Sequence, residues 1–217
     1  MFKSLKSDLT GTADICSIVS KDLSKLHAGA YVLSSPSSPA AADEELLFAF
    51  ASAKEEFAFT NEALITVCGE SATTTRKLIE RIEFRDARIS NVQFETTGRV
   101  DRDCEIKFVI GDRGMSIDIA KKEEKEAKVY YKALVALARE QEERSRRWDF
   151  AQNGLTSAVK SLKLGDSTVK QEQIPGAGGL VGQANQVLEW LSRDFERLNA
   201  RCYKSVIENA LASSTNQ

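Results

Sequence analysis

The chain has 217 residues, of which 42% are hydrophobic and 29% are charged, and its formal net charge is -2. These values are typical of a soluble globular protein and exclude wholesale disorder. The balance of 30 Lys and Arg against 32 Asp and Glu argues against a nucleic-acid binder with a large basic surface. No apolar stretch approaches the roughly 18 residues that a membrane-spanning helix needs, and the first residues do not have a signal-peptide pattern. We therefore expect a soluble, cytoplasmic protein.

Metal-ligating and nucleophilic side chains are too few and too scattered to indicate catalysis. The four cysteines contain no C-x-x-C pair, which predicts reduced thiols in place of a zinc site or a disulfide framework. His27 is the sole histidine, so every Ser-His or Cys-His triad would depend on it. The glycine-rich residues 176–182 do not have the G-x-G-x-x-G spacing of a dinucleotide loop. We expect no catalytic residue, no metal and no cofactor.

Apolar and small side chains recur every three or four residues at the start of the chain, which predicts an amphipathic helix over residues 1–28. Leu5, Leu9 and Leu23 belong to this seam. Gly11 weakens the helix by about 1 kcal/mol relative to alanine, so we expect the helix to need a packing partner. That partner is the rest of the chain, a second chain or a membrane surface, although the mixed charges of the polar face argue against the membrane.

The pattern changes after residues 29–43, whose Ser, Pro and Ala predict a linker. Apolar and polar residues then alternate, which indicates an antiparallel meander of about seven strands with one buried face. Ile106 and Phe108, for example, flank Lys107, so the two apolar side chains should share the buried face. A helical stripe follows the last strand. We therefore predict a domain over residues 44–140 in which one helix caps a bent sheet.

The last part of the chain predicts a helical hairpin. Helices are expected over residues 141–164 and 183–213, joined by a glycine-rich linker over residues 165–182. Their apolar seams include Leu155, Val159, Leu191 and Leu198. We expect these seams and that of the amino-terminal helix to pack together, either within one chain or between the chains of a homo-oligomer.

Three segments of the predicted sheet follow a known pattern. Residues 57–65 form a strand that runs into a Thr-Asn turn, residues 82–98 lead to an E-T-T-G stretch, and residues 101–108 alternate after an acidic residue. In these segments the chain resembles the bacterial pleckstrin-homology (PH) domain family over residues 44–140. The resemblance implies an α+β fold, a bent antiparallel sheet of about seven strands with a capping helix, here with an amino-terminal helix and a carboxyl-terminal helical hairpin added. Glu62 departs from the family, in which a basic or another long residue is common.

The family resemblance implies protein or ligand recognition, often with self-assembly, and no shared catalytic chemistry. The loop 50–56 offers Lys54 beside two glutamates, too few donors for a phosphoinositide. Thr60 and Asn61 are expected to hold a turn between strands. The best candidate for an anionic-partner surface is a basic run with interspersed glutamates: Arg76, Lys77, Arg81, Arg85 and Arg88.

The sequence therefore predicts a non-enzymatic interaction module that mediates protein–protein contacts or self-association. The alternative is a peripheral membrane or anionic-ligand binder that uses the basic run. Salt-sensitive binding to vesicles would favour the alternative.

Overall fold

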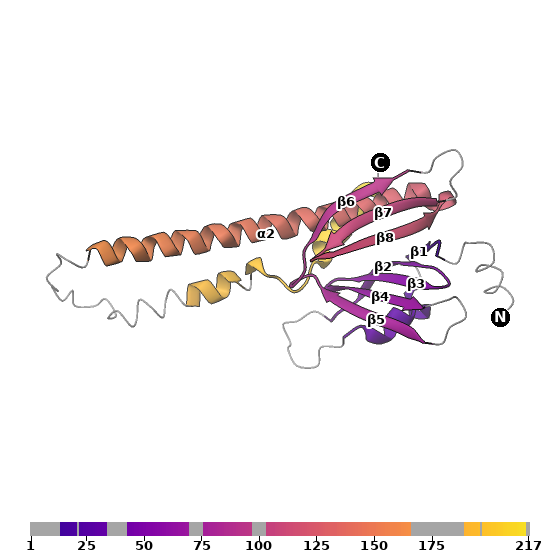
Figure 1. The fold of residues 1–217 in the computed structure, drawn as a ribbon, viewed down its shortest axis with the longest axis horizontal. Helices are drawn as coiled ribbons and strands as arrows, with labels where there is room; N and C mark the ends of the chain where they lie inside the picture. The colour runs from indigo at the N-terminus through magenta and orange to yellow at the C-terminus, as the bar shows by residue number, and fades with distance from the viewer. Residues whose placement is uncertain are drawn as a thin grey trace. The chain divides into compact units, whose positions relative to one another are not determined.

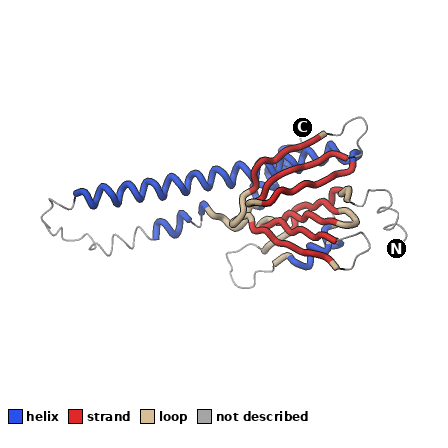
Figure 2. The backbone as a smooth tube through the Cα atoms, viewed as in Figure 1, coloured by secondary structure: helices blue, strands red, loops and turns tan. Residues whose placement is uncertain are grey.

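The computed structural model describes most of the chain, and Figures 1 and 2 show its course with the remaining residues in grey. Two compact units make up the molecule: Met1–Glu140 with Arg201–Gln217, here called the sheet unit, and Gln141–Ala200, here called the helical unit. The described residues are 14–20, 22–33, 43–69, 76–96, 103–165, 189–195 and 197–215, and for 158–165 the description is limited to the backbone.

The sheet unit contains two antiparallel sheets (Figure 2). Consecutive strands are neighbours in both, so each sheet is a meander. The five-stranded sheet contains β1 (Ser17–Val19), β2 (Leu46–Ala51), β3 (Glu55–Thr60), β4 (Ala63–Gly69) and β5 (Lys77–Glu83). The three-stranded sheet contains β6 (Ile89–Glu95), β7 (Asp103–Ile110) and β8 (Arg113–Ala120). The seven strands β2 to β8 confirm the predicted meander and the PH-like α+β fold.

The alternation of side chains decides which face of each strand is buried. In β7 every second residue is buried, as a strand with one face in the core requires. Ile106 and Phe108 are 0% and 2% exposed. The ammonium of Lys107, between them, lies at the surface and pairs with Glu95 and Glu105 at 3.1 and 2.9 Å. The predicted face assignment is therefore confirmed.

The main core fills the inner faces of both sheets and is closed by helices. Phe48 and Phe59 stack with their ring centroids 4.6 Å apart, and Tyr130 of α2 (Glu124–Gly165) lies 4.8 Å from Phe48. Along α2 the buried side chains follow the three-and-four spacing of one helix face: Ala127, Tyr130, Leu134 and Leu137. Ile207 of α4 (Lys204–Thr215) joins the same cluster.

The structure corrects the predicted amino-terminal helix of residues 1–28. Residues 1–13, with Leu5 and Leu9, lie outside the described residues, and residues 17–19 form a strand. Just before β1, Cys16 bonds to β8: its N–H donates to the carbonyl of Asp118 at 2.7 Å, and its carbonyl accepts the N–H of Ala120 at 3.1 Å. This short segment thus forms backbone hydrogen bonds with both sheets, and these bonds favour a strand over the helix that the apolar spacing predicted. The β-branched Ile18 and Val19 also favour a strand.

Residues 22–33 cover the outer face of the five-stranded sheet. They contain two 3-10 helices, η1 (Leu23–Lys25) and η2 (His27–Tyr31). Leu26 and Ala28 are buried in a second core cluster, whose sheet residues are Ala49, Ala58, Ile65 and Val67. Leu23 packs partly buried against this cluster, so it belongs to the cover and not to a helical seam.

The carboxyl-terminal helices also differ from the predicted bounds. Helix α2 runs through residues 140 and 141 without a break, and the predicted helix 183–213 is interrupted after residue 198. The interruption places Tyr203 against Phe84, with ring centroids 6.2 Å apart, and the N–H of Tyr203 donates to the carbonyl of Asn61 at 2.7 Å. Tertiary contacts therefore override the continuous periodicity. Residues 166–188 lie outside the described residues.

Replacing Phe108 with alanine tests the core assignment. We expect Phe108→Ala to lower the free energy of unfolding by about 3 to 5 kcal/mol, because buried contacts are lost and a cavity remains. Lys107→Ala should leave the melting temperature almost unchanged. Urea denaturation of both variants measures the difference, and equal midpoints for the two would contradict the assignment.

Candidate interaction surfaces

The structure does not gather the five basic residues of the run into one patch. Arg76 and Lys77 lie at the start of β5, and Arg85 and Arg88 lie exposed beyond its end. A strand of this length spans about 20 Å, so the two pairs are well separated. Arg81, between them, is engaged with carboxylates.

Two carboxylates hold the Arg81 guanidinium. Nη1 lies 2.8 and 2.9 Å from the two oxygens of Glu44, and Nε lies 2.6 Å from Glu83. Burial alone would lower the pKa of Arg81, but the hydrogen bonds with Glu83 and Glu44 outweigh it and raise that pKa. The charge of Arg81 is therefore neutralised within the fold.

Glu44 is the centre of a buried polar cluster. Besides Arg81, its carboxylate accepts the hydroxyl of Thr60 at 2.6 Å and the backbone N–H of Leu33 at 2.7 Å. Thr60 also accepts the N–H groups of Glu62 and Ala63 at 3.0 and 2.7 Å. The cluster thus ties the outer cover, the turn after β3 and strand β5 together.

Replacing Glu44 alone should destabilise the fold more than replacing both Glu44 and Arg81. We expect Glu44→Leu to lower the free energy of unfolding by about 3 to 5 kcal/mol, because it removes one of the two carboxylates that hold the half-buried Arg81 charge and the acceptor of Thr60 and Leu33. Adding Arg81→Met to Glu44→Leu should recover a large part of that loss. Urea denaturation of the single and double variants measures the coupling.

The matched control is Glu142→Gln, which removes an exposed ion pair with Arg146. It should change the unfolding free energy by less than about 1 kcal/mol. A double variant as unstable as the sum of its two single variants would contradict the coupling.

Asn61 and Glu62 attach the carboxyl-terminal segment to the turn between β3 and β4. The Asn61 side chain accepts the N–H of Glu45 at 2.9 Å and donates to the carbonyl of Asp43 at 3.3 Å. Glu62, whose side chain is 3% exposed, accepts Nε of Arg201 at 2.6 Å. The predicted turn role of Asn61 is confirmed. The partner of Glu62 was missed, because it lies far away in the sequence.

His27 anchors the outer cover. Its backbone N–H and that of Ala28 donate to the buried carboxylate of Glu56 at 3.2 and 3.0 Å, and its ring Nδ1 lies 2.6 Å from the same carboxylate. Nζ of Lys77 lies 3.4 Å from the same ring nitrogen. His27 therefore has a structural role here.

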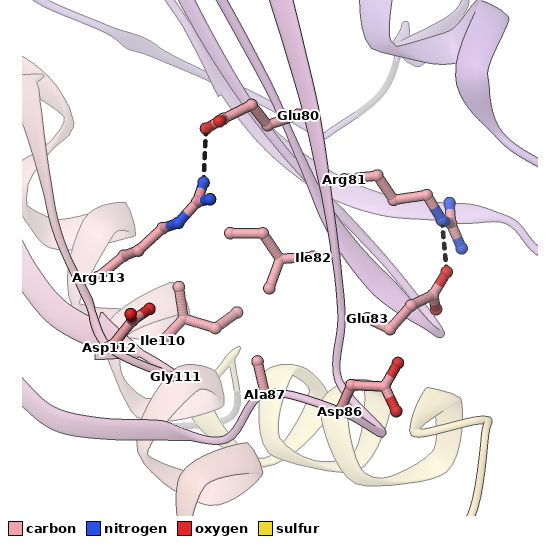
Figure 3. Close-up of a pocket in the computed structure, with 10 residues that line it drawn as sticks. All are labelled: Glu80, Arg81, Ile82, Glu83, Asp86, Ala87, Ile110, Gly111, Asp112 and Arg113. Atoms are coloured by element: carbon pink, nitrogen blue, oxygen red, sulfur yellow. Dashed lines mark hydrogen bonds and ion pairs between the residues drawn. The ribbon is translucent and has the colours of Figure 1, made fainter.

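Three clefts of the sheet unit lie along β5. The acidic cleft has a volume of 490 Å³ and holds the Arg113–Glu80 ion pair of 2.9 Å (Figure 3). The Cys68 cleft, of 710 Å³, is lined by Lys54, Glu55, Cys68, Gly69, Arg76, Lys77 and Leu78. The Tyr31 cleft, of 760 Å³, is lined by Leu26, His27, Ala30, Tyr31, Val67, Arg76, Lys77 and Ile79.

Three of the four thiols, those of Cys16, Cys68 and Cys104, are poor nucleophiles and poor metal ligands. Burial raises the pKa of Cys16 to about 12 and that of Cys104 to about 11, and it also raises the pKa of the exposed Cys68. The described residues hold no group of three or more Cys, His, Asp or Glu placed to bind a metal ion. Nor does any helix in the described ranges have the length and apolarity to cross a bilayer.

Cysteine labelling tests this order of reactivity. At pH 8 a thiol with a pKa of about 12 is ionised in about one molecule in ten thousand, so Cys16 should resist a disulfide reagent until the protein unfolds. Cys68, which is exposed, should react before Cys16 and Cys104. Labelling should accelerate as pH rises, because more thiolate forms. Labelling of Cys16 or Cys104 in the folded protein as fast as that of Cys68 would contradict this order.

The helical unit exposes large aromatic side chains. The ring centroids of Trp148 on α2 and Phe195 lie 5.2 Å apart, which joins α2 to the helical residues 189–195. Phe150 is 81% exposed, Trp190 39% and Phe195 37%.

The predicted seam is only partly closed in this unit. Leu198 is 7% exposed, whereas Leu155 and Leu191 are half-buried. The side chain of Val159 lies outside the described residues. One chain thus leaves part of its seam accessible.

Comparison with known proteins agrees with this architecture. The family model of the bacterial PH domain matches residues 11–138. The uncharacterized protein YvbH of Bacillus subtilis (strain 168) is 35% identical over 163 residues, which cover 75% of this chain and 77% of that protein. The crystal structure of a PH domain containing bacterial protein from Exiguobacterium sibiricum 255-15 superposes with a TM-score of 0.76 at 28% identity, covering 91% of this chain and all of that one.

Proposed function

We propose that this chain, which belongs to the bacterial PH domain family, is a non-enzymatic interaction module that self-associates through its helical unit. The occupant of the exposed helical surface is a second copy of the same chain. The observation that carries the proposal is the exposure of Phe150, Trp190 and Phe195 on this unit. Exposed aromatic groups of this size commonly mark protein interfaces.

The described part of the helical unit buries too little to form a core alone. Two helices bury one side of each seam, and Leu155 and Leu191 stay half-buried. Burying one leucine fully contributes about 1.5 to 3 kcal/mol, so several seam positions together favour association strongly. A bundle formed by several copies closes such seams on all sides.

The charges beside the seam favour a second copy over a charged partner. Residues 140–147 contain three glutamates and three arginines, and ion pairs join Glu142 to Arg146 and Glu143 to Arg147. A surface of balanced charge does not repel its own copy. It also offers no excess charge that would attract a nucleic acid.

The basic run supports the alternative function less well. Arg81 is neutralised by Glu44 and Glu83, and the remaining four residues lie in two pairs, at the start of β5 and beyond its end. Recognition of a phosphate group needs several donors that converge.

Sedimentation velocity and light scattering of the full chain test the self-association. We expect the wild type to form an oligomer, and Phe150→Ser to raise the dissociation constant by at least about tenfold. Because Phe150 is 81% exposed in the single chain, its replacement leaves the fold of the chain intact. Leu191→Asp, which places a charge in the seam, should also release monomers.

The controls carry similar changes at exposed positions beside these residues. Gln152→Ser and Ser192→Asp should associate as the wild type does, since both positions are exposed. A wild-type chain that stays monomeric at every concentration would refute the proposal. So would equal dissociation constants for Phe150→Ser and Gln152→Ser.

A further inference from the structure

Strand β5 leaves one edge of the five-stranded sheet open. Within the described residues its sole ladder partner is β4. Just after the strand, the N–H of Phe84 donates to the carbonyl of Glu62 at 2.8 Å. Because bonding alternates along an antiparallel pair, the even-numbered residues of β5 bond to β4 and the odd-numbered residues face outwards. The carbonyl of Glu83 accepts the N–H groups of Asp86 and Ala87 in the turn that follows. The outward-facing backbone N–H and carbonyl groups of Lys77, Ile79 and Arg81 are therefore the ones that an added strand could bond.

All three clefts flank this open edge. The acidic cleft is lined by Glu80 to Glu83, the Cys68 cleft by Arg76 to Leu78, and the Tyr31 cleft by Lys77 and Ile79 among others. Side chains of a strand point alternately to its two faces. A strand added along the edge would therefore direct its side chains into clefts on both sides of the sheet.

Apolar surface is exposed beside the edge on both faces. Leu78, which lines the Cys68 cleft, is 63% exposed, and Tyr31, which lines the Tyr31 cleft, is 45% exposed. Consecutive apolar side chains of an added strand point to opposite faces, so together they could cover both.

The clefts at the two ends of the edge have linings of opposite charge. In the acidic cleft four carboxylates face two arginines, which leaves a net charge of -2 on its lining (Figure 3). In the Cys68 cleft Lys54, Arg76 and Lys77 face Glu55, which leaves a net charge of +2. The edge therefore discriminates between the two directions in which a charged strand can lie.

We propose that the β5 edge binds an extended segment of a partner protein, which adds to the sheet as an antiparallel strand. Its amino end carries a basic side chain beside the acidic cleft, and its carboxyl end carries an acidic side chain beside Arg76 and Lys77. Apolar side chains lie between. Antiparallel addition continues the pairing of the sheet. This role is separate from self-association, because it uses the other unit of the chain.

Peptide binding to the full chain tests the proposal. The probe is a capped, fluorescent peptide of about nine residues with lysines at its amino end, alternating valine and threonine, and glutamates at its carboxyl end. A second peptide carries the charged ends exchanged. Fluorescence anisotropy should show about tenfold tighter binding of the first peptide.

Lys77→Glu should reduce this preference, because it takes the net charge of the Cys68 cleft from +2 to 0. Lys122→Glu, the same charge change at an exposed lysine outside β5, should leave the preference unchanged. Amide exchange followed by NMR of the wild type gives an independent result. The amides of Lys77, Ile79 and Arg81 should exchange at least about tenfold more slowly with the peptide bound. Those of Leu78, Glu80 and Ile82, already bonded to β4, should change little.

No binding of either peptide would overturn the proposal, and so would binding without protection of the three odd-numbered amides. Protection that rises with protein concentration when no peptide is present would identify a second copy as the occupant and overturn it equally. The Phe150→Ser variant separates the two proposals, because it should lose self-association and keep the binding of the peptide.

Discussion

The turn between β3 and β4 holds the sheet unit together, because three consecutive buried residues must each satisfy polar groups there. Thr60 and Asn61 are 0% exposed and Glu62 is 2% exposed. Leaving any of these groups without a partner would cost a large part of a domain's stability. Thr60 and Asn61 both bind the segment just before β2, through Glu44 and Glu45, and Glu62 binds Arg201 near the end of the chain.

This constraint explains why the chain returns to the sheet unit after residue 200. Tyr203 and Ile207 are buried in the main core, and Tyr203 also donates to Asn61. Lys204 pairs with Glu45 beside the same turn. The helical unit is consequently an insertion in the sequence of the sheet unit, which needs residues from both sides of that insertion to complete its core.

The sequence predicted correctly those elements in which the spacing of apolar residues matches the buried face. The alternation around Ile106 and Phe108 and the helical stripe of Tyr130 and Leu134 hold in the structure, because each side chain is buried as its spacing requires. The amino-terminal strand was not predictable, because backbone bonds from Cys16 to Asp118 join residues far apart in the sequence. Candidate surfaces were harder still. The members of the basic run lie close together in sequence, but the length of β5 separates its two ends in space and Glu44 pairs with Arg81.

The bridge at Cys16 has a consequence for how the two sheets can deform. Cys16 is bridged to β8, and the residues that follow it form β1, which pairs with β2. Backbone hydrogen bonds therefore hold the two sheets together on this side. On the opposite side, among the described strands, no ladder joins β5 to β6, and the Arg113–Glu80 ion pair crosses there. Ion pairs at a surface yield far more readily than backbone ladders. Thermal fluctuations should therefore separate the two sheets first beside β5, where an ion pair joins them, while the hydrogen bonds at Cys16 keep them together.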